Sequence, residues 1–218
     1  WCAGTALAAA ALRSGPLTVG AVLLAAAWMA IHPVPGGSGR GLPVLSYPPV
    51  AAGLYLLSFW TRSQPARHLL VLSLVLFAFL VHVQDGSSLA VPVLLVAVSA
   101  ALFAFGHLRP QEAGRFLGLG SGLPVHALVG FLAGIGILQV ELVDEPSRFL
   151  LPTILAVAGI VAALLLEGRE NTLLRWLAYA AFVFQLCFVY GVMLGSMLGT
   201  AGFFVLGGLT LSALAWLI

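Results

Sequence analysis

Charge is what this sequence has least of. Only 7% of its 218 residues are Asp, Glu, Lys or Arg, whereas a soluble globular domain carries about 25%. This shortage excludes a water-soluble globule, and the net charge of +2 gives no reason to expect a nucleic-acid partner. Lysine is absent, and all nine basic residues are arginine. Apolar residues make up 61% of the chain instead, so the lipid bilayer is its expected surroundings.

Residues for catalysis and metal binding are also scarce. The two cysteines, Cys2 and Cys187, fall in different apolar stretches, so neither a disulfide nor a metal site follows. The sequence has no His-Glu-x-x-His motif and no paired intramembrane aspartates. Ser121 with nearby His126 is only superficially similar to the site of an intramembrane serine protease. An enzyme is therefore not favoured, and we assign no catalytic, cofactor-binding or metal residue.

Long apolar runs dominate what is present. A membrane-spanning helix needs about 20 apolar residues, and polar, proline and glycine clusters divide the chain at regular intervals. We therefore predict an all-α, polytopic transmembrane bundle of about nine spans. These spans cover residues 1–12, 15–32, 44–61, 66–83, 88–107, 124–141, 148–166, 173–194 and 198–218. Both ends of the chain are apolar, so we expect residues 1–218 to be a single domain within a longer chain, with its first span incomplete and its last span open to the same interpretation.

The division between the last two predicted spans rests on the length of the apolar stretch. An unbroken helix over residues 173–218 would be about 69 Å long, more than twice the thickness of the hydrocarbon layer. We therefore predict a turn around Gly195–Ser196 and Gly199.

The arginines predict the orientation of the bundle. Loops that follow odd-numbered spans hold seven arginines, and loops that follow even-numbered spans hold only Arg40 and Arg148. Because positive charge collects in cytoplasmic loops, we expect the odd loops inside a bacterial cytoplasmic (inner) membrane. The start of the chain would then lie outside and its end inside.

One loop needs a separate interpretation. Residues 109–122 are too polar to begin a span and too long for a tight turn. Their first part predicts a short amphipathic helix on the cytoplasmic surface. The glycines at 118, 120 and 122 allow two hypotheses: a phosphate-cradling loop, or a flexible interfacial linker. The first lacks the strand that normally precedes such a loop.

Ionisable residues inside the membrane, the usual mark of a proton or ion path, are almost missing. Glu141 is the deepest carboxylate, and it lies within one turn of an external loop, so we interpret it as interfacial. Gln185 is the strongest polar group within a span. We expect it to form an interhelical hydrogen bond rather than a substrate contact.

The histidines suggest one specific cofactor. His68 and His82 lie 14 residues apart on one predicted span, which places them about 40° apart around the helix and about 21 Å apart along it. Membrane b-type cytochromes stack two haems on a similar spacing, with His32, His107 and His126 as potential partners. All five histidines lie at helix ends, however, and only one helix carries the paired spacing. We therefore predict no haem.

Small residues form the one abundant motif. Gly130 and Gly134, and again Gly191, Gly195 and Gly199, are spaced four residues apart. This spacing lets helix backbones approach closely. We expect internal packing, with a subunit contact as the alternative.

A resemblance covers about 45 residues near the C-terminus. Leu174-Arg-Trp-Leu-Ala-Tyr179, followed by Leu198-Gly-Thr-Ala-Gly-Phe-Phe-Val-Leu-Gly-Gly208, is similar to the last hairpin of uncharacterised bacterial polytopic inner-membrane proteins. That group has no established activity. The resemblance therefore implies a membrane fold and location only.

Three functions follow as hypotheses. The lack of polar machinery favours a non-catalytic accessory or structural subunit of a membrane complex, with membrane-protein partners. The alternative is a transporter of a neutral or lipidic solute, since such a substrate needs no buried charge. A b-type haem subunit is the least favoured.

Overall fold

The computed structural model describes residues 1–31, 46–85 and 88–217. These residues form helices and no strand, which confirms the predicted all-α class. The α-helices are α1 (Cys2–Leu12), α2 (Gly15–Ile31), α4 (Tyr47–Trp60), α5 (Gln64–Asp85), α6 (Ala90–Leu108), α7 (Pro110–Leu117), α8 (Leu123–Glu141), α9 (Pro146–Glu167) and α10 (Thr172–Leu217). A 3-10 turn, η1 (Gly120–Gly122), leads into α8. The predicted helix at the start of residues 109–122 is α7.

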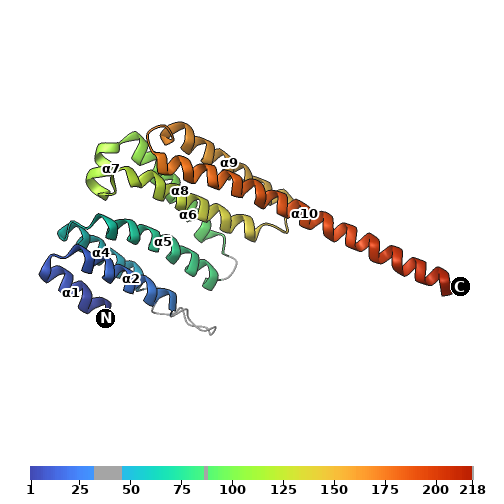
Figure 1. Cartoon of the computed structure of the whole chain (residues 1–218), viewed down its shortest axis with the longest axis horizontal. Coiled ribbons are helices and arrows are strands. Elements are labelled where there is room, and N and C mark those ends of the chain that lie inside the picture. Colours follow the sequence, from blue (N-terminus) through green and yellow to red (C-terminus); the bar gives the residue numbers. More distant parts are fainter. Residues whose placement is uncertain (32–45, 86–87, 218) are drawn as a thin grey trace.

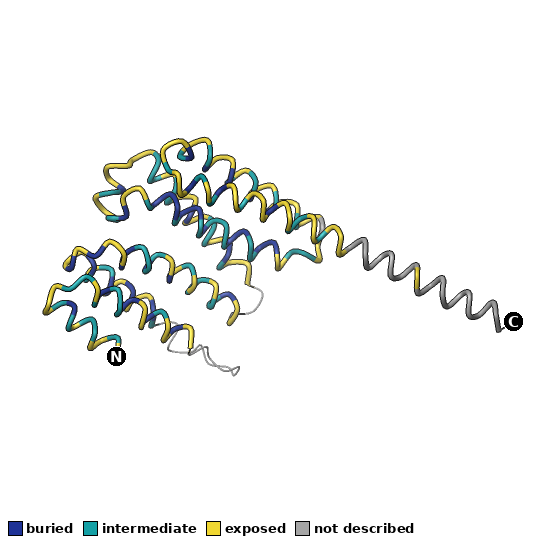
Figure 2. Tube along the Cα trace, viewed as in Figure 1, coloured by how far each residue is buried: buried dark blue, intermediate teal, exposed yellow. Residues whose placement is uncertain are grey.

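The helices pack as two groups that lie side by side (Figure 1). The N-terminal group comprises α1, α2, α4 and α5, and its core includes Met29, Tyr47 and Leu70. The C-terminal group comprises α6, α8, α9 and α10, with Ile160 and Leu174 in its core. Contact between the groups runs through α5, which touches both α6 and α8. Half of the apolar stretch of α8 is buried, the largest share among the long helices (Figure 2).

The count of about nine spans is not confirmed. In the described residues, five helices are long and apolar enough to cross a membrane: α5, α6, α8, α9 and the part of α10 up to Gly195. Helices α1, α2 and α4 contain 11, 17 and 14 residues and are shorter than a usual span. They lie in the N-terminal group, at the blue end of the bundle in Figure 1.

The predicted turn at Gly195–Ser196 and Gly199 is wrong. Helix α10 continues through these positions to Leu217, and its last part extends beyond the other helices (Figure 1). The physical reason is that glycine weakens a helix by only about 1 kcal/mol, and no proline interrupts residues 172–217. The prediction that the chain ends on the cytoplasmic side depended on this turn and loses its basis.

The arginine-rich loops meet at one end of the bundle. The seven arginines of the odd loops all belong to this arginine end, which also holds Glu112, Glu167 and Glu170. The contacts that join its loops include Arg13 over the Trp60 ring at 4.6 Å, Arg67 Nη1 to Gly118 O at 2.7 Å, and Asn171 Nδ2 to Ser121 O at 2.8 Å. At the opposite end the described residues include four carboxylates and one arginine, Arg148. Charge is therefore sorted along the bundle axis.

The two small-residue motifs differ in their surroundings. A Cβ at Gly130 would lie 2.5 Å from Ser99 Oγ, and one at Gly134 would lie 3.0 Å from Pro92 O. These glycines therefore bring α8 close against α6, as predicted. A Cβ at Gly191 or Gly195 would meet nothing within 4 Å. Within the described residues, the expected internal packing is thus wrong for that part of α10.

Candidate functional site

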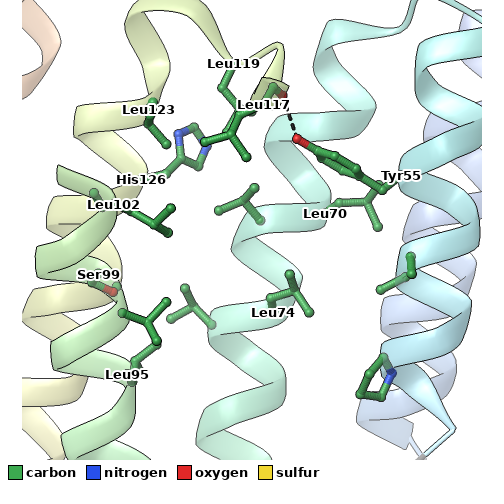
Figure 3. A pocket seen from close by; sticks show the side chains of 18 residues that line it. Tyr55, Leu70, Leu74, Leu95, Ser99, Leu102, Leu117, Leu119, Leu123 and His126 are labelled. Carbon is green, nitrogen blue, oxygen red and sulfur yellow. Dashed lines mark hydrogen bonds between the residues drawn. The ribbon is translucent and has the colours of Figure 1, made fainter. Parts of the chain in front are cut away.

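An apolar cavity of about 410 Å³ lies between the two helical groups (Figure 3). Helices α4 and α5 form one side of it, and α6 and α8 form the other. Leu70, Leu74, Leu95 and Leu102 supply much of the wall. The few polar side chains among the lining residues are Tyr55, Ser99 and His126. A space of this kind suits an apolar ligand with a small polar part.

Small side chains create the space. Ser99 on α6 and Ala127 and Gly130 on α8 are buried and line the cavity. Because Ser99 lies directly against Gly130, the two helices approach closely there. The rim of the cavity, unlike this buried part, is exposed on the outside of the bundle. The exposed lining residues are Pro48, Ala52, Leu74 and Val98. The cavity therefore opens sideways, toward the surface that would face lipid.

The arginine end of the cavity is closed by polar contacts. Tyr55 Oη donates a hydrogen bond to Leu117 O at 2.6 Å, which fixes the end of α7 over α4. Leu117 and Leu119 line the cavity from this turn, and His126 lies beside them (Figure 3). His126 Nδ1 lies 2.7 Å from Gly122 O. Because a carbonyl only accepts, Nδ1 is the donor in this hydrogen bond.

Two histidine contacts join α5 to α8. His68 stacks on His126, with ring centroids 4.9 Å apart and planes 20° apart. His82 Nε2 lies 3.0 Å from Glu141 Oε1 at the opposite end. Both helices start at the arginine end, so they run parallel. The spacing between the contacts is about 21 Å along α5 and about 22 Å along α8. The predicted common face of His68 and His82 is the face toward α8.

This geometry does not fit haem. A bis-histidine haem needs two imidazole nitrogens that point at one iron from opposite sides of a macrocycle. His68 and His126 instead stack face to face with no room for a macrocycle between them. His82 uses Nε2 to contact Glu141, and His107 Nδ1 lies 2.8 Å from Glu167 Oε1. His32 lies outside the described residues.

Two of the three glycine amides in the glycine-rich loop are used within the chain. Gly118 N donates to Gly114 O, and Gly122 N donates to Leu119 O, both at 3.0 Å. Gly118 has φ +59° and Gly120 has φ +54°, values that other residues adopt at a cost. A Cβ at Gly118 would also collide with Arg67 Nη1. Gly118 and Gly120 therefore serve a tight turn, and this use of the glycines does not favour the phosphate-cradling hypothesis.

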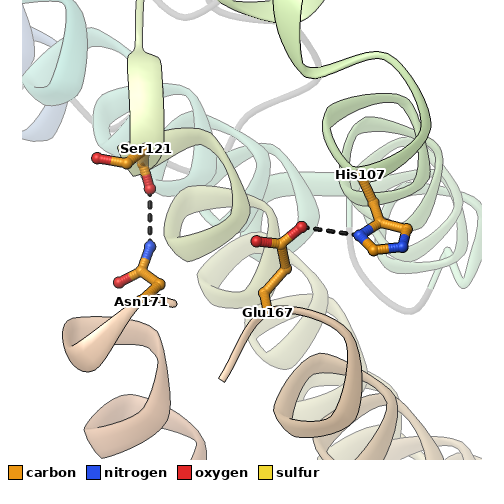
Figure 4. A network of polar contacts seen from close by, with 4 residues as sticks. All are labelled: His107, Ser121, Glu167 and Asn171. Atoms are coloured by element: carbon orange, nitrogen blue, oxygen red, sulfur yellow. Dashed lines mark hydrogen bonds and ion pairs between the residues drawn. The ribbon is translucent and has the colours of Figure 1, made fainter. Parts of the chain in front are cut away.

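A second, more polar pocket of about 540 Å³ lies at the arginine end, between α6, η1 and the α9–α10 turn. Its lining includes the His107–Glu167 pair and the Asn171–Ser121 contact (Figure 4). Within the described residues no hydrogen bond joins Ser121 to His126. The serine-protease-like pair that the sequence suggested is therefore not assembled. No group of three His, Cys, Asp or Glu side chains in the described part could hold a metal ion.

The two polar groups singled out within predicted spans have different surroundings from those expected. Gln185 is buried, and in the described part of the chain its Nε2 has no hydrogen-bond partner. The interhelical amide contact is made by Gln139 instead, whose Nε2 donates to Thr153 Oγ1 at 3.1 Å between α8 and α9. Glu141 is not merely interfacial, because it pairs with buried His82. Span alternation, which places residues 82 and 141 at the same end, could have indicated that pair.

The fold and cavity are compatible with a multi-pass membrane protein: a helical bundle with five long apolar helices and an apolar space between its two groups. No family model matches the chain, and neither a curated protein nor a solved structure matches it.

Proposed function

We propose that this chain is an integral membrane protein that binds a lipid-like molecule between its two helical groups and moves it across or within the bilayer. The observation that carries the proposal is the apolar cavity with a sideways opening. Its volume of about 410 Å³ falls in the range of about 300–1,000 Å³ found for small-molecule sites. Of the functions that the sequence suggested, the cavity favours a transporter of a lipidic solute over an accessory subunit.

The lining supports a chain-like ligand. Its walls are mostly leucine, valine and alanine, and its polar groups lie toward one end or at the α6–α8 contact. A molecule with an apolar chain and one polar end would place the chain along α5 and α8 and the polar end near Tyr55 and His126. Entry from the side avoids carrying the chain through water, because the exposed rim faces the expected position of lipid.

The sorting of charge supports an orientation. The arginine end carries seven arginines and three glutamates, and such ends face the cytoplasm. We place this end on the inner side of a bacterial cytoplasmic membrane, and α7 at that surface. The similarity of the C-terminal region to uncharacterised inner-membrane proteins agrees with this location.

The test is photo-cross-linking with a neutral probe, hexadecanol carrying a mid-chain diazirine. We expect the purified wild-type protein to be labelled on cavity residues of α5 and α8. Ala52→Phe places a ring at the cavity rim and should reduce this labelling to background. Ala101→Phe is the matched control, since Ala101 is exposed on α6 and does not line the cavity.

Labelling confined to the outer surface, or equal labelling of both variants, would contradict the proposal. A transport assay then follows in liposomes that contain only the purified protein. If the chain is active only with a co-purifying partner in stoichiometric amount, the accessory-subunit hypothesis is the correct one.

A further inference from the structure

One cation beside the cavity has no counter-charge. The Arg67 side chain projects from the first turn of α5, and the residue is only 9% exposed. Within the described residues it forms no ion pair. Two of the three glutamates of this end pair elsewhere, Glu112 with Arg109 and Glu167 with His107, and the third, Glu170, is exposed and forms no ion pair with Arg67 in the described part of the chain. Burying a charge without a partner costs free energy, so an anion bound at this position would stabilise Arg67.

The guanidinium is also short of hydrogen-bond acceptors. It has five N–H donors. Nη1 donates to Gly118 O at 2.7 Å, and the guanidinium carbon lies 4.3 Å from the centre of the Phe59 ring. Nε is buried and has no partner in the described part of the chain. A carboxylate or phosphate oxygen is the acceptor that best suits a guanidinium with free donors, because it can accept two parallel hydrogen bonds.

Arg67 lies directly next to the closed end of the cavity. Its acceptor, Gly118, lies between Leu117 and Leu119, which both line the cavity. Phe59, under the guanidinium, packs edge-to-face on Tyr55, another lining residue, with centroids 5.3 Å apart. Arg67 does not itself line the cavity, so an acidic group bound at Arg67 would be joined to a chain in the cavity past the Tyr55–Leu117 contact, which must open to admit it.

We infer that the cavity takes an anionic amphiphile, a molecule with one acidic headgroup and an alkyl chain, and that Arg67 binds the headgroup. This inference rests on the proposed function and names its ligand class. It also supplies selectivity that the cavity walls lack. Bulk lipid is as apolar as leucine, so moving a chain from lipid into the cavity gains little, and recognition must come from the polar end.

The experiment compares four probes in detergent: hexadecanoate, hexadecyl phosphate, hexadecanol and inorganic phosphate, each competing with the photoreactive alcohol. We expect wild type to bind the two anionic chains about tenfold more tightly than the alcohol, since a hydrogen bond to a charged group contributes enough for that ratio. Arg67→Gln should remove this preference and leave alcohol binding unchanged. Arg169→Gln, at an exposed arginine of the same end, should keep it.

Retained alcohol binding shows that the cavity of a variant is folded. If Arg67→Gln does not fold, Arg67→Lys replaces it, and a reduced but measurable preference is expected because lysine offers a point charge in place of the guanidinium fork. An unchanged preference in Arg67→Gln, or equal loss of acid and alcohol binding, would overturn the inference. If inorganic phosphate, which has no alkyl chain, competes with the photoreactive alcohol as well as the anionic chains do, the site binds free anions, and the assignment of an amphiphile is wrong.

The failures are distinguishable. If no chain binds to wild type, the proposed function fails. If the alcohol binds as well as the acids, the proposed function stands and the assignment of Arg67 fails.

Discussion

Replacing Gly134 by alanine should destabilise this protein, although alanine is the better helix former. Gly134 lies on α8 where that helix packs against α6. A Cβ there would lie 2.7 Å from Val96 Cγ2, 3.0 Å from Pro92 O and 3.1 Å from Val96 N. Two of these three atoms belong to the backbone of α6. They cannot turn away as a side chain can, so the new methyl group must push the helices apart.

Two opposing terms set the magnitude. Alanine in place of glycine stabilises a helix interior by about 1 kcal/mol. Overfilling a packed contact costs about 1–3 kcal/mol, and the upper half of that range applies where backbone must move. The net effect is a loss of about 1–2 kcal/mol, which lowers the unfolding midpoint of a chain this size by about 2–8 °C.

The assay is thermal unfolding in detergent, followed by the loss of the monomer peak in size-exclusion chromatography at one fixed heating time, since unfolding of such proteins is often irreversible. Gly136→Ala is the matched control two residues along α8, because a Cβ at Gly136 meets nothing within 4 Å. Its midpoint should be unchanged or slightly higher. Equal midpoints for the two variants would refute the close α6–α8 contact.

Three further predictions test the ends of the bundle. In a variant without native cysteines, a membrane-impermeant maleimide should label Asp144→Cys in intact cells, and it should label Gln111→Cys only after permeabilisation. The reverse pattern would show that the proposed orientation is inverted. A double-mutant cycle of His82→Ala and Glu141→Ala should give a coupling of about 1 kcal/mol from apparent unfolding midpoints, because Glu141 is about one-third exposed; no coupling would mean that the contact is absent in the folded protein. Tyr55→Phe removes one hydrogen bond and should cost about 0.5–1.5 kcal/mol. It should also speed amide exchange in α7, and unchanged exchange there would contradict the role of Tyr55 in fixing that helix.

The helical segments could be predicted because they depend on local sequence. Proline, glycine and polar clusters end helices wherever they occur, and the segments 15–32, 66–83 and 124–141 match α2, α5 and α8 within a few residues. The meeting of the arginine-rich loops at one end also follows, since neighbouring helices alternate in direction. The failure at Gly195 has a different origin. It used the thickness of a bilayer to infer a turn, whereas the backbone itself has no reason to break there.

The side-chain pairs were harder to predict. Helices that are apolar on all sides give no sign of which face meets which neighbour, so span alternation could place residues 82 and 141, and residues 68 and 126, at the same ends but could not show that their side chains touch. The haem hypothesis identified the shared face of His68 and His82 correctly and named His126, which lies against His68, but it did not name Glu141 as the partner of His82. Arg67 gave no signal, because its sequence neighbours look like any other interfacial loop. The absence of a carboxylate next to the Arg67 side chain, among the described residues, can be seen only in the folded structure.

The same α5–α8 contacts explain why an open cavity persists in the bundle. If the two helical groups met only through apolar side chains, they could close over any gap by sliding together, since the loss of packing around a void favours collapse. Directional contacts at both ends of α5 oppose that movement. The stacked His68–His126 pair fixes the spacing at the arginine end, and the His82–Glu141 hydrogen bond fixes it about 21 Å away. The polar pairs therefore act as spacers that hold the apolar region between them open.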